Sequence, residues 1–146
     1  MTVTLTIAGQ VYQRWTGTRV TRGLLRACGG FEVETPGEID PPILPFAPCV
    51  LADDGEPVIT GYVDEARIEI AARGTKTRIT GRSKTADLVD CMPDLTTNQF
   101  SGYALDAIAR AMAAPFGINV VVSPGVNVGD RSQTRLTNGM NPRFAF

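Results

Sequence analysis

The sequence predicts a mainly β protein (β+α), in which a small antiparallel β-barrel is followed by a short helix and the start of an α/β domain. Residues 2–80 alternate apolar and polar side chains in short runs, which turn residues separate about every 8–12 residues. Near residue 83 the period changes to that of a helix. A content of 43% hydrophobic and 20% charged residues is typical of a globular chain.

The first strands are expected at residues 2–8, 11–22 and 31–34. In residues 2–8, apolar side chains alternate with threonines, which predicts a strand with one wet face. Residues 11–22 are rich in aromatic and β-branched types, which favour strands. Repeated prolines break residues 35–48, and proline cannot donate to a ladder, so this stretch is predicted to be an extended surface connection.

The β pattern returns at residue 49. The Asp-Gly step Asp54-Gly55 predicts a tight hairpin turn before a strand at 58–63, because these residue types tolerate positive φ. Residues 66–71 alternate, with Ala66, Ile68 and Ile70 on one face. A further strand is expected at 75–80.

Helices are expected after residue 83. Ser83 is a plausible N-cap for a short helix whose buried side includes Leu88, Val89 and Cys91. A longer helix from Leu105 carries one apolar stripe. It ends near Gly117, and a strand is expected after it at residues 118–122. The predicted domains are a barrel with its helix (1–91), the start of an α/β domain (92–122) and an irregular tail (123–146).

Catalytic chemistry finds little support in the sequence. Histidine is absent, which removes the commonest general base and transition-metal ligand. Cys28, Cys49 and Cys91 lack metal-binding spacing and are expected to be buried, inert thiols. Residues 79–91 have the strand–turn–helix order of a phosphate-binding loop, but the glycine spacing does not fit one. No catalytic residue, cofactor or metal is predicted.

A small barrel could instead bind single-stranded nucleic acid. This function needs aromatic residues between basic ones, and Trp15 with Arg14, Arg19 and Arg22 is the available set. The net charge of −1 gives no bulk attraction to a polyanion, and a core role for Trp15 is favoured. No segment has the length and apolarity of a membrane span.

Several motifs resemble those of one family, the baseplate hub proteins of Mu-like contractile-tailed phages and prophages. The longest is residues 58–91, VITGYVDEARIEIAARGTKTRITGRSKTADLVDC. A Trp-Thr step at Trp15-Thr16 and the segment Leu105 to Gly117 match the family as well. The residues that carry the resemblance and are expected to have structural roles are Trp15, Gly61, Tyr62, Asp64, Gly81, Arg82, Lys84, Thr85, Asp87 and Asp90.

The resemblance implies a barrel of the tail-tube or hub type and a structural role without catalysis. In the family, three subunits with two barrels each form a ring that joins the tail tube to the spike. It therefore implies self-association as a trimer and contacts with tube and spike proteins. Neither a membrane nor a specific nucleic acid is expected as a partner, with DNA able to pass through the family's channel. The implied location is the tail baseplate of the virion, after synthesis in a bacterial cytoplasm.

Two further expectations follow from the resemblance. Family members are much longer than this chain, so the sequence is interpreted as a fragment or the product of a truncated gene. The contacts between subunits are expected along the first strands, at Val3, Leu5 and Trp15.

Overall fold

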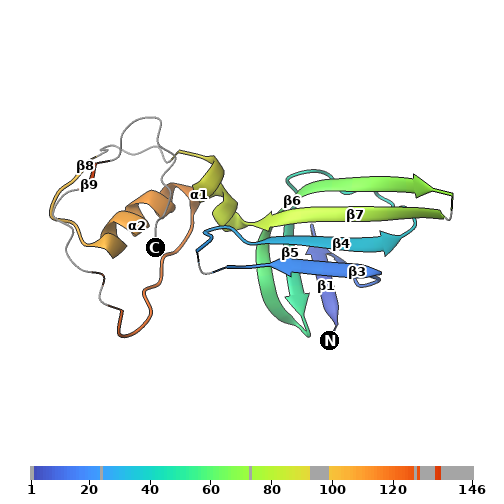
Figure 1. Ribbon diagram of the computed structural model, residues 1–146, viewed down its shortest axis with the longest axis horizontal. Coiled ribbons are helices and arrows are strands. Elements are labelled where there is room, and N and C mark those ends of the chain that lie inside the picture. Colours follow the sequence, from blue (N-terminus) through green and yellow to red (C-terminus); the bar gives the residue numbers. More distant parts are fainter. Residues whose placement is uncertain are drawn as a thin grey trace. The chain divides into compact units, whose positions relative to one another are not determined.

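A computed structural model describes residues 2–23, 25–72, 74–92, 99–126, 128 and 134–135 of the chain (Figure 1). The contacts divide the chain into two compact units, Met1–Ala86 and Asp87–Phe146. The elements of the first unit are β1 (Val3–Ile7), β2 (Gln10–Tyr12), β3 (Gly17–Thr21), β4 (Gly30–Pro36), β5 (Pro48–Asp53), β6 (Glu56–Ala71), β7 (Gly74–Ser83) and the 3-10 turn η1 (Lys84–Ala86).

The strands of the first unit form one seven-stranded antiparallel sheet in the order β2-β1-β5-β6-β7-β4-β3. Its two edge strands are neighbours in the sequence, and residues 13–16 join them. This connection spans at most about 17 Å, so the sheet must roll until its two edges approach each other. The mainly β prediction is confirmed, and the sheet is rolled as a barrel would be.

The closed barrel itself needs a correction, because no ladder joins β2 to β3 among the strands described. The connection between the two edges is held by hydrogen bonds instead. The indole Nε1 of Trp15 donates a hydrogen bond to the Val3 carbonyl oxygen on β1 at 2.9 Å. The amide of Thr16 donates to the Glu34 carbonyl oxygen on β4 at 2.8 Å. Adjacent residues of one short connection are thus tied to opposite sides of the rolled sheet.

The concave face of the sheet holds the hydrophobic core of the first unit. Trp15 packs against this core, which confirms its expected core role. The alternation of apolar and polar residues in the sequence explains why this face is apolar. Val33 on β4 and Ile79 on β7 are fully buried, while their chain neighbours point outward. The buried residues are Leu5, Ile7, Phe31, Val33, Cys49, Leu51, Ile59, Val63 and Ile79.

Two hairpin turns require left-handed backbone. Asp54 and Gly55 have φ of 48° and 88°, which confirms the Asp-Gly turn between β5 and β6. Ala8 and Gly9, with φ of 49° and 86°, form the equivalent turn between β1 and β2. Alanine tolerates this conformation poorly, and the sequence gives no sign of it beyond the following glycine.

Strand β6 is 16 residues long and belongs to two ladders. It pairs with β5 from Glu56 to Tyr62 and with β7 from Gly61 to Ala71. The second register shifts between Val63 and Glu65, so Asp64 is the extra residue of a β-bulge. Beyond the bulge, β6 and β7 continue together as a long hairpin (Figure 1).

The second unit contains the helices α1 (Asp87–Asp90) and α2 (Leu105–Ala113), the 3-10 turn η2 (Ala114–Phe116) and the short pair β8 (Gln99–Phe100) and β9 (Thr134–Arg135). Its small core contains Phe100, Ile108 and Met112. The predicted long helix is confirmed. It ends at Ala113 and continues into η2, which Gly117 caps with a left-handed φ of 62°, as is common after helices.

Three predictions for the segment from Ser83 to residue 122 are wrong. Ser83 does not cap a regular helix. Its hydroxyl oxygen accepts a hydrogen bond from the Gly29 amide at 3.0 Å, and the chain next makes the η1 turn. Cys91 is exposed, because α1 is a single turn too short to bury a continuous side. Residues 118–122 form no strand in the described structure, where no neighbouring strand pairs with them.

Replacing Gly61 by alanine tests how closely β6 and β7 pack. A Cβ at this position would overlap the Arg82 carbonyl oxygen and lie 2.7 Å from the Ser83 Cα. Backbone cannot yield as a side-chain tip can, so we expect Gly61→Ala to lower the free energy of unfolding by about 3 kcal/mol. The loss is measured by urea denaturation followed by circular dichroism.

Gly17→Ala is the matched control, because a Cβ there would meet its nearest neighbour at 3.7 Å, an ordinary contact. Its unfolding midpoint should stay close to that of the unmodified chain. Equal losses in both variants would contradict the close packing at Gly61.

Candidate interaction surface

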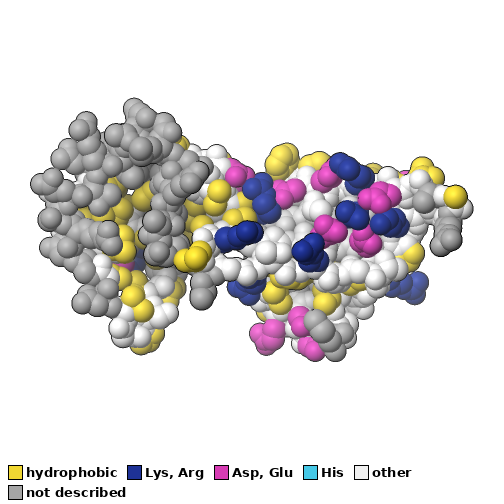
Figure 2. All heavy atoms as spheres, viewed as in Figure 1, with side chains coloured by type: hydrophobic (Ala, Val, Ile, Leu, Met, Phe, Trp, Pro, Cys, Tyr) yellow, Lys and Arg dark blue, Asp and Glu magenta, His cyan; other side chains and the backbone are white. Residues whose placement is uncertain are grey.

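The convex side of the sheet carries a lattice of charged side chains over β4, β7 and β6, which Figure 2 shows as interspersed basic and acidic groups. We call this the charged face. Residues opposite one another on neighbouring strands share a face, and the registers of β3, β4, β7 and β6 place its members together. It consists of Arg19, Glu32, Glu34, Glu65, Arg67, Glu69, Lys76 and Arg78.

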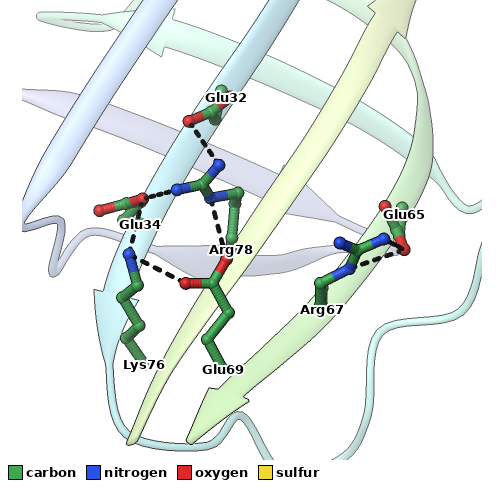
Figure 3. Close-up of polar contacts among 7 residues, drawn as sticks. All are labelled: Glu32, Glu34, Glu65, Arg67, Glu69, Lys76 and Arg78. Atoms are coloured by element: carbon green, nitrogen blue, oxygen red, sulfur yellow. Dashed lines mark hydrogen bonds and ion pairs between the residues drawn. The ribbon is translucent and has the colours of Figure 1, made fainter. Parts of the chain in front are cut away.

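Arg78 and Lys76 on β7 lie at the centre of this lattice (Figure 3). The Arg78 guanidinium donates to Glu34 at 2.7 Å, and its nitrogens lie 3.6 Å from Glu32 and 3.5 Å from Glu69. The Lys76 ammonium lies 3.2 Å from Glu34 and 3.1 Å from Glu69. Three strands are thereby cross-linked by two cations and three carboxylates.

These contacts move the pKa values of the groups at the centre. The hydrogen bond from Lys76 is the main cause that holds the pKa of Glu34 below its ordinary value, and Arg78 adds to it. The pKa of Lys76 is raised chiefly by its hydrogen bond to Glu69, then by that to Glu34. The pKa of Arg78 is raised chiefly by Glu34. Each group therefore favours the charged form of its partners.

Two more ion pairs flank the centre. Arg67 bonds Glu65 on the same strand at 2.9 Å. At the bulge, the Nε of Arg82 donates to the Asp64 carboxylate at 2.8 Å. The bulge points the Asp64 side chain toward Arg82 of β7, which explains how two residues of the recognised motif come together.

The two motif glycines lie where chain segments approach most closely. Gly81 is opposite Phe31 on β4 and Val63 on β6. A Cβ on it would lie 2.5 Å from the Phe31 ring and from the Tyr62 carbonyl oxygen. With Gly61, it lets the paired strands β6 and β7 lie close together, and Gly81 leaves room for the buried Phe31 ring.

The remaining motif residues are spread over several elements. Tyr62 is half-buried on β6, opposite Arg82. Lys84 and Thr85 lie in η1, where the hydroxyls of Thr85 and Ser83 are 2.7 Å apart. Most residues of the motif thus lie on β6, at the end of β7 and in η1, and Asp87 and Asp90 follow in α1.

The contact surface predicted at Val3, Leu5 and Trp15 is contradicted at Leu5 and stays a prediction at Val3 and Trp15, which are partly buried. Leu5 is fully buried, and Trp15 packs against the same core. Leu5 points into the rolled sheet because alternate residues of β1 face its concave side. Alternation identifies an apolar face, but it does not say whether that face meets the core or a neighbouring molecule.

The nucleic-acid interpretation loses its aromatic residue for the same reason. The Trp15 ring packs on the core, and its N–H is bonded to Val3. Bases stack on exposed aromatic faces, which this arrangement does not offer. Arg14, Arg19 and Arg22 are exposed, but Arg67, Lys76, Arg78 and Arg82 are matched by carboxylates. The charged face therefore has little excess positive charge.

Sequence reasoning missed a group of exposed apolar residues. Ile68 and Ile70 lie on the predicted apolar face of β6, yet 45% and 84% of their surfaces are exposed. Leu44 and Phe46, in the proline-rich connection, are 68% and 79% exposed. Two large apolar residues in a surface connection were a usable signal for the second pair.

Within the residues that the structure describes, no group of three or more potential metal ligands gathers in one place. No helix in that part of the chain is long and apolar enough to cross a membrane. Cys49 is the buried thiol of the core, and its pKa is raised to about 11 by burial, with a smaller contribution from the Asp64 charge. It is suited to packing and not to nucleophilic chemistry.

Comparison with protein families agrees with the motifs. Residues 2–83 match the family described as Mu phage baseplate assembly protein GpP-like, N-terminal. Residues 85–139 match the family described as baseplate hub protein gp44-like, second domain. Baseplate hub protein gp44 of Escherichia phage Mu is 36% identical over 122 residues, which are 82% of this chain. The chain spans 32% of the length of that curated relative.

Solved structures show the same fold. The 43 kDa tail protein of prophage MuSo2 from Shewanella oneidensis matches with a TM-score of 0.86 and 34% identity, over 97% of this chain and 46% of that one. A tail protein from Neisseria meningitidis MC58 matches with a TM-score of 0.67 and 23% identity, over 78% of this chain and 33% of that one. The similarity to the Neisseria protein shows a shared fold and nothing more.

Acid should weaken the lattice at Glu34. A carboxyl whose pKa is lowered on folding stabilises the protein above its unfolded pKa, and this contribution is lost as the pH falls through the folded value. We therefore expect the unfolding free energy of the unmodified chain to fall between about pH 5 and 3. Glu34→Gln should be less stable at pH 7, and the difference should shrink over that range.

Urea denaturation at several pH values measures this convergence. Glu56→Gln, at the exposed turn between β5 and β6, is the control and should leave the pH profile unchanged. A difference between Glu34→Gln and the unmodified chain that stays constant from pH 7 to 3 would show that the carboxylate charge does not stabilise the sheet.

Alkylation should separate the thiols. Iodoacetamide at pH 8 should modify exposed Cys91 quickly, and Cys49 more than about a hundredfold more slowly, because its thiolate is rare and covered. Mass spectrometry of digested samples gives both rates. Comparable rates in the folded protein would contradict the packing at Cys49, and 8 M urea should equalise them.

Proposed function

The chain belongs to the Mu GpP-like and gp44-like family of phage baseplate hub proteins, and we propose that it is a structural component of a phage or prophage tail baseplate. The observation that carries this proposal is the match of residues 2–83 to the family, together with the fold shared with a prophage tail protein at a TM-score of 0.86. Its work is to hold neighbouring proteins together, in the central hub that joins a tail tube to a spike.

The construction of the first unit supports a scaffold role. Its concave side is filled by packed apolar side chains, and its convex side is tied by ion pairs across three strands. Rigid, cross-linked surfaces suit a part that transmits force between neighbours. We propose that the chain is not an enzyme and uses no cofactor, in line with a sequence that has no histidine.

The partners follow from the family. We propose that the chain contacts copies of itself, as a trimer in the family, and the tube and spike proteins of the same tail. The virion baseplate is then its place of action, after synthesis in a bacterial host. DNA would pass through the ring without specific recognition.

Specific parts of the chain have proposed roles. Residues 1–91 would act as the tube-like domain, 92–122 as the start of an α/β domain and 123–146 as a divergent tail. The motif residues would shape the exit from the sheet: Gly61 and Gly81 permit close strands, and Asp64 with Arg82 fixes the bulge.

Co-assembly with tail proteins tests the proposed function. The purified chain is mixed with the tube and spike proteins of the same phage or prophage, and the mixture is separated by size-exclusion chromatography with light scattering. We expect co-elution with at least one of them at micromolar concentration. A full-length hub relative in parallel is the control, and its co-elution while this chain elutes alone would overturn the proposal.

A titration with fluorescein-labelled single-stranded DNA at low salt tests the alternative, a single-stranded nucleic-acid-binding barrel. We expect no saturable binding at micromolar concentration, because Trp15 is packed on the core. Tight binding that weakens steeply with salt would favour the alternative instead.

A further inference from the structure

A cavity of about 580 Å³ opens beside the connection between β2 and β3. Its wall comes from two segments of the first unit, residues 11–15 and the end of β4 with the residues after it. The volume lies within the range of ligand sites, about 300–1,000 Å³. The wall includes two aromatic side chains, three charged ones and one aliphatic one, and we call this space the acidic cavity: Tyr12, Arg14, Trp15, Glu38, Ile39 and Asp40.

The charges of the acidic cavity do not balance within the chain. Glu38 and Asp40 are exposed carboxylates, and Arg14 is the cation of the same wall. Among the residues that the structure describes, none of these three side chains forms a hydrogen bond or an ion pair. One negative charge is therefore left uncompensated, and a single cationic group from outside would match it.

The segment that carries the two carboxylates is fixed to β7. The Gly37 amide donates to the Thr75 carbonyl oxygen at 2.8 Å. The buried hydroxyl of Thr77 donates to the Gly37 carbonyl oxygen, also at 2.8 Å. Ile39, which lies between the two carboxylates in the sequence, packs against the core. The backbone is thus anchored before a ligand arrives, which lowers the entropic cost of binding.

The aromatic part of the wall is fixed as well. Tyr12 and Trp15 are half-buried and pack against the core. The Trp15 indole is tied to the Val3 carbonyl oxygen at 2.9 Å. Thr16 donates to the Glu34 carbonyl oxygen through its amide at 2.8 Å and through its hydroxyl at 3.2 Å. The cavity therefore has a firm apolar wall and two unmatched carboxylates.

We propose that the acidic cavity takes the side chain of an arginine presented by a partner protein of the tail. Arginine has an aliphatic stem that can lie along the aromatic wall. Its planar guanidinium forms paired hydrogen bonds with carboxylates and is more weakly hydrated than the ammonium of lysine. Its single charge equals the charge that the chain leaves uncompensated. This inference deepens the proposed function and rests on it.

Arg14 should act against the incoming arginine. Its guanidinium belongs to the wall of the same cavity, so it repels a second cation. Loss of a carboxylate should therefore weaken binding, and loss of Arg14 should strengthen it. Opposite effects from neighbouring exposed residues are the mark of a charge-selective site.

Fluorescence of Trp15 tests the site directly, because this residue is the only tryptophan of the chain and lines the cavity. The probes are N-acetylarginine amide and N-acetylcitrulline amide, which has nearly the same shape without the charge. We expect saturable binding of the arginine probe with a dissociation constant of about 1 mM, and binding of the citrulline probe at least tenfold weaker. Equal binding of the two probes, or tighter binding of N-acetyllysine amide, would overturn the inference.

Substitutions in the wall give the second readout. Glu38→Gln combined with Asp40→Asn should weaken binding of the arginine probe at least tenfold. Arg14→Gln should strengthen it about threefold. All three side chains are exposed, so these variants should keep the circular dichroism spectrum of the unmodified chain. Glu56→Gln, outside the cavity, is the control and should not change binding. Weaker binding by Arg14→Gln would contradict the proposed charge balance.

Co-elution with the tube and spike proteins separates this inference from the proposed function. We expect the variant without the two carboxylates to bind its partner at least tenfold more weakly, while Glu56→Gln binds as the unmodified chain does. Equal co-elution of the carboxylate variant and the unmodified chain would overturn the inference and leave the proposed function standing. An unmodified chain that elutes alone would count against the proposed function, and the probe titration would still decide whether the cavity binds arginine.

Discussion

Two strands at opposite edges of one sheet are joined by residues 13–16, and much of the first unit follows from this constraint. So short a connection forces the sheet to roll. Rolling gives it one concave face, which the apolar side chains of every second position fill. Trp15 and Thr16 tie the connection to β1 and β4. The convex face is left to charged residues, which pair across strands.

The segment where β6 passes from one ladder to the next has no room for side chains at two positions. β6 leaves its ladder with β5 and continues with β7. At this point the β7 backbone leaves no room for a Cβ at Gly61, and the Phe31 ring and the Tyr62 carbonyl oxygen leave none at Gly81. The bulge at Asp64 follows immediately and changes the register. Glycine, bulge and ion pair therefore act together to turn one strand from one ladder to the next.

Local pattern predicted much of this fold, because strand alternation, the turn at Asp54-Gly55 and the stripe of α2 are encoded in neighbouring residues. Pairing between distant residues was not predictable in the same way. Nothing near Arg78 in the sequence reveals that it meets three glutamates from two other strands. The exposure of Ile70 depends on where β5 stops. The recognised motif located the glycines, but their steric reason needs the geometry of both ladders.

The matched charges of the convex face affect how the protein meets others. Arg67, Lys76 and Arg78 each lie within 4 Å of a carboxylate, so this part of the surface produces a weak field at a distance. Encounters with another protein through this face are then little steered by charge, with association rate constants of about 10⁵–10⁶ M⁻¹s⁻¹ that change little with ionic strength. Association through this face would then depend on protein concentration and on the fit of the contacts, and a change in ionic strength would alter it little.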